Sequence, residues 1–143
     1  AKNDVDVNYS DINKYKIVKS GQKIAIIALG DFFQMGEELI MEIEKQLGIN
    51  ATLINPRFIT GLDEEMLEKL EKNHNIVITL EDGILDEGFG QKIASFYGTS
   101  EMNVFNYGLK KEFLDQYDLK KVMEKNHLQP DLIINDLKNS RCI

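Results

Sequence analysis

The sequence is short of three things that would point to particular classes of protein: cysteine, basic residues and long apolar runs. Its single cysteine, Cys142, stands next to the last of the 143 residues, so the chain forms no internal disulfide. One cysteine fits a reducing, cytoplasmic setting. Lysine and arginine number 17 against 24 aspartates and glutamates, which gives a formal net charge of -7. That balance argues against a nucleic-acid partner, because such a partner requires a basic face.

Long apolar runs are absent as well. No stretch approaches the roughly 20 apolar residues that a helix needs to cross a bilayer. No charged region followed by an apolar region opens the chain. We therefore expect no membrane partner. The chain begins at Ala1 rather than at methionine, which suggests a processed start or a segment cut from a longer polypeptide.

What is present is an alternation of strand and helix patterns. Continuous apolar and β-branched runs predict strands buried on both faces. These runs lie at 23–30, 49–54, 75–80 and 102–108, with a further short strand expected near 15–18. Apolar residues at helical spacing predict helices. These helices are expected at 35–47, 64–71, 91–98, 119–125 and 130–137.

The alternation predicts an α/β fold, with three αβα layers around a mostly parallel, mixed sheet of about five strands. Gly48 is expected to end one helix, and Asp63 to cap the start of the next. The stretch from Glu81 to Gly90 is expected to be a long loop. We divide the chain into an interdomain connector at 1–19 and a single domain at 20–143.

Glycine turns next to helices are the first place to look for chemistry. Neither phosphate-binding glycine motif follows Gly30, at the end of the first long strand. The triplet Gly88–Phe89–Gly90 stands just before a helix, where it forms either a tight turn or a site for an anion at the helix start. Carboxylates around this loop favour the turn, since they would repel an anion. They are Glu81, Asp82, Asp86 and Glu87.

Those carboxylates could alternatively hold a metal ion, although their spacing matches no calcium loop. Glu81, at the end of a strand, is the one of them most expected to have a fixed structural place. Histidines 74 and 127 stand near helix ends, where capping is the favoured interpretation. Arg57 could bind an anion, hold a loop through carbonyl groups, or pair with Asp63 or Glu64, and the sequence leaves these choices open.

The order of these segments resembles the C-terminal domain of transketolase-like thiamine-diphosphate enzymes, and within that group the 1-deoxy-D-xylulose-5-phosphate synthases. The resemblance covers about residues 17–137. The matching positions are Arg57, Phe58, Leu62, Asp63, Glu64, Glu65, His74, Glu81, Gly83 and Gly88 to Gly90. The chain departs from the pattern at Gly61, Asp82, Glu87 and Lys110, all in expected loops.

The resemblance implies a domain that supports a homodimer and packs on the preceding domains of the same chain. In the whole enzyme those preceding domains bind thiamine diphosphate and magnesium, so this segment implies no catalytic, cofactor-binding or metal-binding residue of its own. The whole enzyme condenses pyruvate with glyceraldehyde 3-phosphate and releases carbon dioxide, a step toward isoprenoids and thiamine. The structural or interface candidates are Arg57, Phe58, Asp63, Glu81, Gly88, Phe89 and Gly90.

Two alternatives stand beside this interpretation. The chain could be the same domain from a transketolase or from the beta subunit of a 2-oxo-acid dehydrogenase. It could also be a standalone, non-catalytic interaction domain. If the chain is the C-terminal domain of such a synthase, the isolated segment is expected to be inactive, although it forms part of a transferase.

Overall fold

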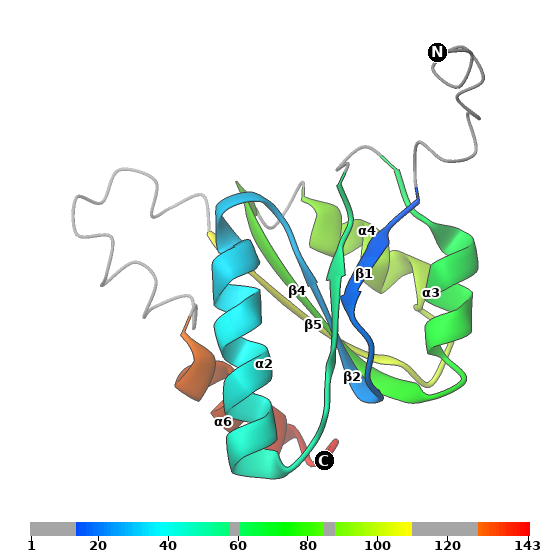
Figure 1. Ribbon diagram of the computed structural model, residues 1–143. Coiled ribbons are helices and arrows are strands. Elements are labelled where there is room, and N and C mark those ends of the chain that lie inside the picture. Colours follow the sequence, from blue (N-terminus) through cyan, green and yellow to red (C-terminus); the bar gives the residue numbers. More distant parts are fainter. Residues whose placement is uncertain (1–13, 58–60, 85–87, 110–128) are drawn as a thin grey trace, which may run out of the picture.

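The computed structural model describes residues 14–57, 61–84, 88–109 and 129–143 (Figure 1). Phe58 lies outside the described residues. So do Asp86, Glu87, Lys110, His127 and the helix expected at 119–125.

A five-stranded mixed sheet forms the centre of the molecule, in the order β1-β3-β2-β4-β5. Its strands are β1 (Lys16–Lys19), β2 (Lys23–Ala28), β3 (Thr52–Asn55), β4 (His74–Ile84) and β5 (Asn103–Leu109). β2 pairs in parallel with β3 and β4, and β4 with β5, whereas the edge strand β1 is antiparallel to β3. The expected α/β fold class is confirmed.

Helices cover both faces of the sheet and give the expected three layers (Figure 1). The described helices are α2 (Phe33–Leu47), α3 (Glu64–Leu70), α4 (Phe89–Phe96) and α6 (Pro130–Ser140), with a short 3-10 helix, η2 (Gly30–Phe32), before α2. Helices α2 and α6 pack on one face, and α3 and α4 pack on the other. Within the described part of the chain, no helix is both long and apolar enough to cross a membrane.

The continuous apolar run of β2 reflects burial on both faces. Ile24 and Ile26 point into the core under α2, whereas Ala25 and Ile27 point into the core under α3 and α4. All four side chains are fully buried. A strand between two helical layers has no solvent face, so its sequence does not alternate with polar residues.

The residues expected to end α2 and to cap α3 have these roles in the structure. Gly48 adopts a left-handed conformation with φ of 69° after the last turn of α2, and its N–H donates to the Glu44 carbonyl oxygen at 3.0 Å. The Asp63 carboxylate caps α3 by accepting a hydrogen bond from the Met66 N–H at 3.2 Å. Glycine suits the first position because it lacks a Cβ, and aspartate suits the second because its oxygen satisfies an otherwise unpaired N–H.

Two stretches differ from expectation. The segment Glu81–Ile84 continues β4 rather than starting a loop, and Ile84 pairs with Leu109 across a register shift. The neighbouring strand β5 pairs with this extension through Leu109. In the sequence, the glycine at position 83 had favoured a loop here. The strand expected near 15–18 is present as β1, so the sheet begins within the range assigned to the connector.

Candidate functional site

The carboxyl edge of the parallel strands gathers most of the residues singled out in the sequence. Strands β2 to β5 point the same way, so their last residues meet at one edge of the sheet. Helices α3 and α4 begin at this edge (Figure 1). In α/β folds, loops at this edge are the usual place for a functional site.

Glu81, on β4, is buried with 3% of its surface exposed. Its Oε1 accepts a hydrogen bond from the Phe89 N–H at 2.9 Å, and its Oε2 accepts one from the Gly90 N–H at 2.6 Å. Gly88 is the N-cap residue of α4 and supplies no side chain of its own. The carboxylate therefore caps this helix from the sheet, against the positive end of the helix dipole.

Gly90 lies against both Glu81 and a polar pair on the neighbouring strands. A Cβ at position 90 would come within 2.8 Å of Asn106 Oδ1 and of Glu81 Oε2. Thr79, which faces Asn106 in the β4–β5 register, donates its hydroxyl hydrogen to Asn106 Oδ1 at 2.6 Å. The second glycine of the Gly88–Phe89–Gly90 turn thus permits the close approach of α4 to the sheet.

Asp63 serves two segments at once. Besides capping α3, its Oδ2 accepts a hydrogen bond from the Tyr15 N–H at 2.9 Å, across 48 residues of sequence. The Tyr15 hydroxyl group donates to the Gly61 carbonyl oxygen at 3.2 Å. Asp63 and Gly61 therefore hold the residue that precedes β1 against the start of α3.

Tyr15 links the two groups of contacts. The residue is 4% exposed, and its ring centroid lies 6.0 Å from that of Phe89, with an angle of 60° between the ring planes. Burial raises the pKa of Tyr15 to about 12, and the negative charge of Asp63 also raises it. At neutral pH Tyr15 is therefore protonated, and it acts as a hydrogen-bond donor.

A continuous set of contacts thus runs through Asp63, Tyr15, Phe89, Gly90 and Glu81. The sequence singled out four of these five residues, and the structure brings them together. Tyr15 was missed, since one tyrosine beside a short strand carries no sequence signal for a contact 48 residues away. Asn106 and Thr79 were missed for the same reason, because neither belongs to a motif.

Arg57 lies apart from these contacts. Its backbone is left-handed, with φ of 63°, and the Asn55 side chain accepts a hydrogen bond from the Arg57 N–H at 2.9 Å. The side chain is exposed. Among the described residues, no acidic group lies within ion-pairing distance of Arg57, and the Asp63 carboxylate is engaged with Tyr15 and Met66. Of the choices that the sequence left open for Arg57, a pair with Asp63 or Glu64 is not formed among the described residues.

A side chain of the protein occupies the start of α4 at the carboxyl edge. The N-terminus of α4 could have held a phosphate, but the carboxylate of Glu81 takes that position. Within the described ranges, no three histidine, cysteine, aspartate or glutamate side chains gather where they could hold a metal ion. The described contacts at this edge hold the start of α4 against the sheet.

The opposite edge carries a second polar group, around His74. Its Nδ1 donates to the Leu70 carbonyl oxygen at 3.1 Å, so Nε2 is the acceptor for the Thr52 hydroxyl group, 2.8 Å away. Thr52 Oγ1 in turn accepts a hydrogen bond from the Gly21 N–H at 2.8 Å. Burial lowers the pKa of His74, in agreement with a neutral ring. The expected capping of a helix end by His74 is confirmed.

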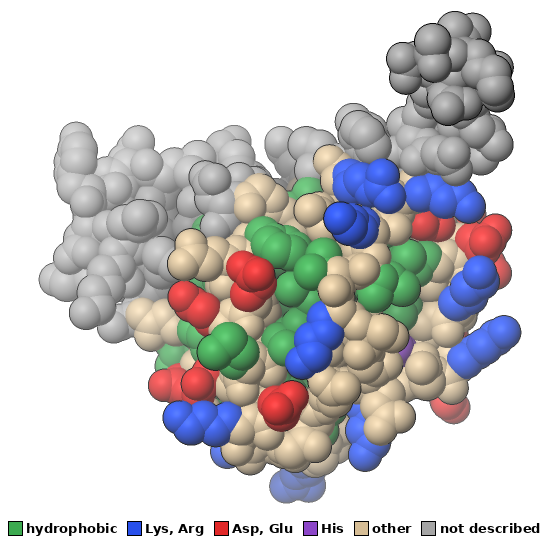
Figure 2. All heavy atoms as spheres, viewed as in Figure 1, with side chains coloured by type: hydrophobic (Ala, Val, Ile, Leu, Met, Phe, Trp, Pro, Cys, Tyr) green, Lys and Arg blue, Asp and Glu red, His purple; other side chains and the backbone are tan. Residues whose placement is uncertain are grey.

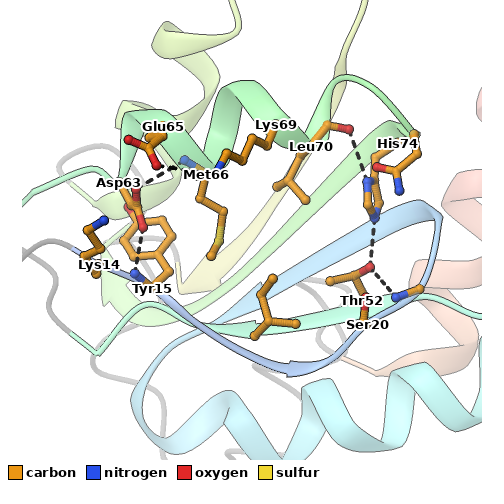
Figure 3. Close-up of a pocket in the computed structure, with 13 residues that line it drawn as sticks. Lys14, Tyr15, Ser20, Thr52, Asp63, Glu65, Met66, Lys69, Leu70 and His74 are labelled. Atoms are coloured by element: carbon orange, nitrogen blue, oxygen red, sulfur yellow. Dashed lines mark hydrogen bonds and ion pairs between the residues drawn. The ribbon is translucent and has the colours of Figure 1, made fainter. Parts of the chain in front are cut away.

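A hollow of about 370 Å³ lies between β1 and α3, with His74 and Thr52 at one end and Asp63 at the other (Figure 3). Tyr15, Ile17, Met66 and Leu70 provide apolar lining. The polar groups at its ends are hydrogen-bonded to the protein itself. Lys14, Glu65 and Lys69 also line the hollow, so it offers both apolar and charged groups.

The family model for the transketolase C-terminal domain matches residues 13–131 of this chain. A 1-deoxy-D-xylulose-5-phosphate synthase from Lachnoclostridium phytofermentans is 31% identical over 131 residues, which make up 90% of this chain and 21% of that protein. The synthase from Francisella tularensis subsp. novicida is 35% identical over 109 residues, covering 73% of this chain and 17% of that protein. The chain thus spans about a fifth of the length of these relatives.

Solved structures show the same fold. A split-gene transketolase described as an inactive beta4 tetramer gives a TM-score of 0.77 at 20% identity, covering 89% of this chain and 42% of that one. The transketolase from Campylobacter jejuni gives a TM-score of 0.57, also at 20% identity, covering 89% of this chain and 18% of that one.

Proposed function

The chain belongs to the transketolase C-terminal domain family, and from this premise we propose that it is the C-terminal domain of a 1-deoxy-D-xylulose-5-phosphate synthase. The observation that carries the proposal is the 31–35% identity to synthases of this name, over most of this chain and about a fifth of theirs. The family match alone would fit a transketolase or a 2-oxo-acid dehydrogenase equally well.

In this proposal the domain supports a homodimer and leaves the cofactor to the preceding domains. When bound there, thiamine diphosphate supplies the carbanion chemistry that joins pyruvate to glyceraldehyde 3-phosphate with loss of carbon dioxide. The described residues support this division, since the Glu81 carboxylate caps α4 where a diphosphate could otherwise bind. We place the enzyme in the cytoplasm, in keeping with its single cysteine.

In this proposal, the chain's own residues hold its helices and strands in place. Asp63, Tyr15 and Phe89 hold the starts of α3 and α4 and the start of β1 in one arrangement. The exposed Arg57, set apart on its turn, is the best candidate for contact with another domain or subunit. We expect it to donate hydrogen bonds to carboxylates or carbonyl groups across that interface.

The test is an assay of the native protein, captured with an antibody raised against this domain. We expect a band several-fold larger than 16.4 kDa and release of carbon dioxide from pyruvate that requires glyceraldehyde 3-phosphate. Release without the aldehyde, or no release, would contradict the proposed reaction. A band near 16.4 kDa would contradict fusion to the cofactor-binding domains.

A second measurement tests whether the cofactor binds to the preceding domains and not to this one. Calorimetric titration of the 143-residue chain with thiamine diphosphate and magnesium is expected to show no saturable binding. Saturable binding would show that this domain holds the cofactor itself, and the positioning role would be wrong.

A further inference from the structure

No described residue pairs with the outer side of β1. This strand is the first in the sheet order, and β3 is its partner on the inner side. Figure 1 shows β1 at this edge of the sheet. An edge strand presents a row of N–H and carbonyl groups with which another strand can pair.

Apolar surface accompanies this edge. Ile17 and Val18 on β1 are each 46% exposed, and they are two of the four large apolar side chains that are exposed in the described part of the chain. Ile17 also lines the hollow of about 370 Å³ between β1 and α3. Exposed apolar side chains beside a hollow favour contact with a partner that buries them.

The same edge is basic, although the chain as a whole has a net charge of -7. Lys14, Lys16 and Lys19 lie in β1 or directly before it, and no aspartate or glutamate occurs between residues 12 and 30. Lys19 forms an exposed ion pair with Glu44, whereas the other two lysines form none with the described residues. Figure 2 shows basic side chains over this edge. Such a concentration of positive charge attracts an acidic partner.

The apolar and basic side chains of β1 lie on different faces of the strand. Ile17 pairs with Ile54, which belongs to the core under α3 and α4. Lys19 pairs with Leu53, which belongs to the core under α2. Lys16 precedes Ile17, so alternation places it on the α2 face as well. A strand added here meets apolar surface on the α3 face and positive charge on the α2 face.

We propose that the β1 edge binds an extended, acidic segment of a partner protein by strand addition. In this segment acidic and apolar residues alternate, so that the apolar side chains face Ile17 and the hollow, and the carboxylates face Lys16 and Lys19. Backbone hydrogen bonds to an edge strand provide affinity, and the alternate side chains provide specificity.

Charge favours this occupant over a second copy of β1. In an antiparallel pair of two β1 strands, the lysines of one copy lie close to those of the other, and like charges across a strand pair are destabilising. Lysines and a bulge, which here follows Ile17, are devices that keep edge strands from pairing with themselves. An acidic strand turns the same lysines into attractive contacts, so the edge discriminates between the two partners.

The experiment is an NMR titration of the full, isotope-labelled chain with a short synthetic peptide in which glutamate and leucine alternate. We expect saturable binding, and at least about tenfold slower hydrogen exchange for the β1 amides that point away from β3. Two control peptides should not protect these amides. One has lysine in place of glutamate, and the other has the original composition with its glutamates and leucines in two separate blocks.

Variants test the role of charge. Lys16→Glu should weaken binding of the alternating acidic peptide at least about tenfold, because a like charge then faces the added strand. Combining it with Lys19→Glu should transfer binding to the alternating peptide of lysine and leucine. The matched control, Lys138→Glu on the exposed side of α6, makes the same change of net charge and should alter binding by less than about threefold.

The amides of Ile76 and Ile78 in β4 report whether each variant is folded. In a folded chain, no saturable binding up to about 1 mM peptide, or equal protection by all three peptides, would overturn the proposal. Slow exchange of the outward β1 amides before peptide is added would also overturn it, since the edge would already be paired. If that protection increases with protein concentration, the occupant is a second copy. None of these results depends on the proposed enzyme, so failure here leaves the proposed function untouched.

Discussion

Gly90 donates its N–H to Oε2 of Glu81 at 2.6 Å, and this hydrogen bond fixes the start of helix α4 to strand β4. The carboxylate is buried, and the Phe89 N–H shares it. The sequence left open whether this helix start forms a tight turn or a site for an anion. The structure shows a tight turn that also binds an anionic group. That anionic group is the Glu81 carboxylate.

Replacing this carboxylate should reduce stability. Glu81→Gln puts an amide group against two N–H donors, so one donor loses its acceptor. A buried unsatisfied donor costs about 1–3 kcal/mol of the free energy of unfolding. Urea unfolding followed by circular dichroism measures the loss. The matched control is Glu68→Gln on the exposed face of α3, which should change stability by less than about 0.5 kcal/mol; equal losses would contradict the capping role.

Adding a methyl group at position 90 should be destabilising because of contact with Asn106. The new Cβ in Gly90→Ala would lie 2.8 Å from Asn106 Oδ1 and from Glu81 Oε2. Overpacking of this kind costs about 1–3 kcal/mol. Combining it with Asn106→Ala should recover part of the loss in a double-mutant cycle. Additive effects of the two changes would show that the two residues do not interact.

Asp63→Ala should cost more than the loss of an ordinary helix cap. A cap alone contributes about 0.5–2 kcal/mol, and Asp63 also accepts the Tyr15 N–H, which is left without that acceptor. We expect a loss of about 2–3 kcal/mol in urea unfolding. Glu65→Ala, two residues away in an exposed pair with Lys69, should change stability by less than about 1 kcal/mol. Equal effects would rule out the second role of Asp63.

Stability should fall as the pH drops below about 6.5, and His74 should be responsible. Burial lowers the pKa of His74 in the folded state, while the unfolded chain keeps the ordinary value near 6.5. Between these two values the unfolded state binds more protons, so acid favours unfolding. The measurement compares urea midpoints at pH 7.5 and 5.5 for the native sequence and for His74→Gln. An unchanged pH dependence in the variant would assign the effect to other groups.

Arg57→Gly should leave the isolated domain at least as stable as before. The arginine holds a left-handed backbone with φ of 63°, where glycine avoids a strain of about 1 kcal/mol. Its guanidinium is exposed, so no buried contact is lost. If Arg57 contacts another domain or subunit, the same change in the proposed full-length synthase should lower the affinity of the proposed dimer or the activity. Full activity and an unchanged dimer would remove Arg57 from the interface candidates.

The sequence predicted the helices and strands whose formation depends on residues close together in the chain. The fully apolar run of β2 marked a strand buried on both faces, and the carboxylate of Asp63 marked a helix start one turn before Met66. These predictions held because each depends on residues a few positions apart. The same rule explains the error at Glu81–Ile84, where pairing with a strand more than 20 residues away extended β4 beyond its apolar run.

By itself, then, the sequence determined the α/β layers and the residues that start and end the helices, since hydrophobic period and capping chemistry act over one or two turns. The tertiary structure decided what those residues contact. It placed Tyr15 between Asp63 and Phe89, turned Glu81 toward α4, and left Arg57 exposed on a left-handed turn. Contacts between residues so distant in the chain are set by the packing of three layers, and no local pattern records them.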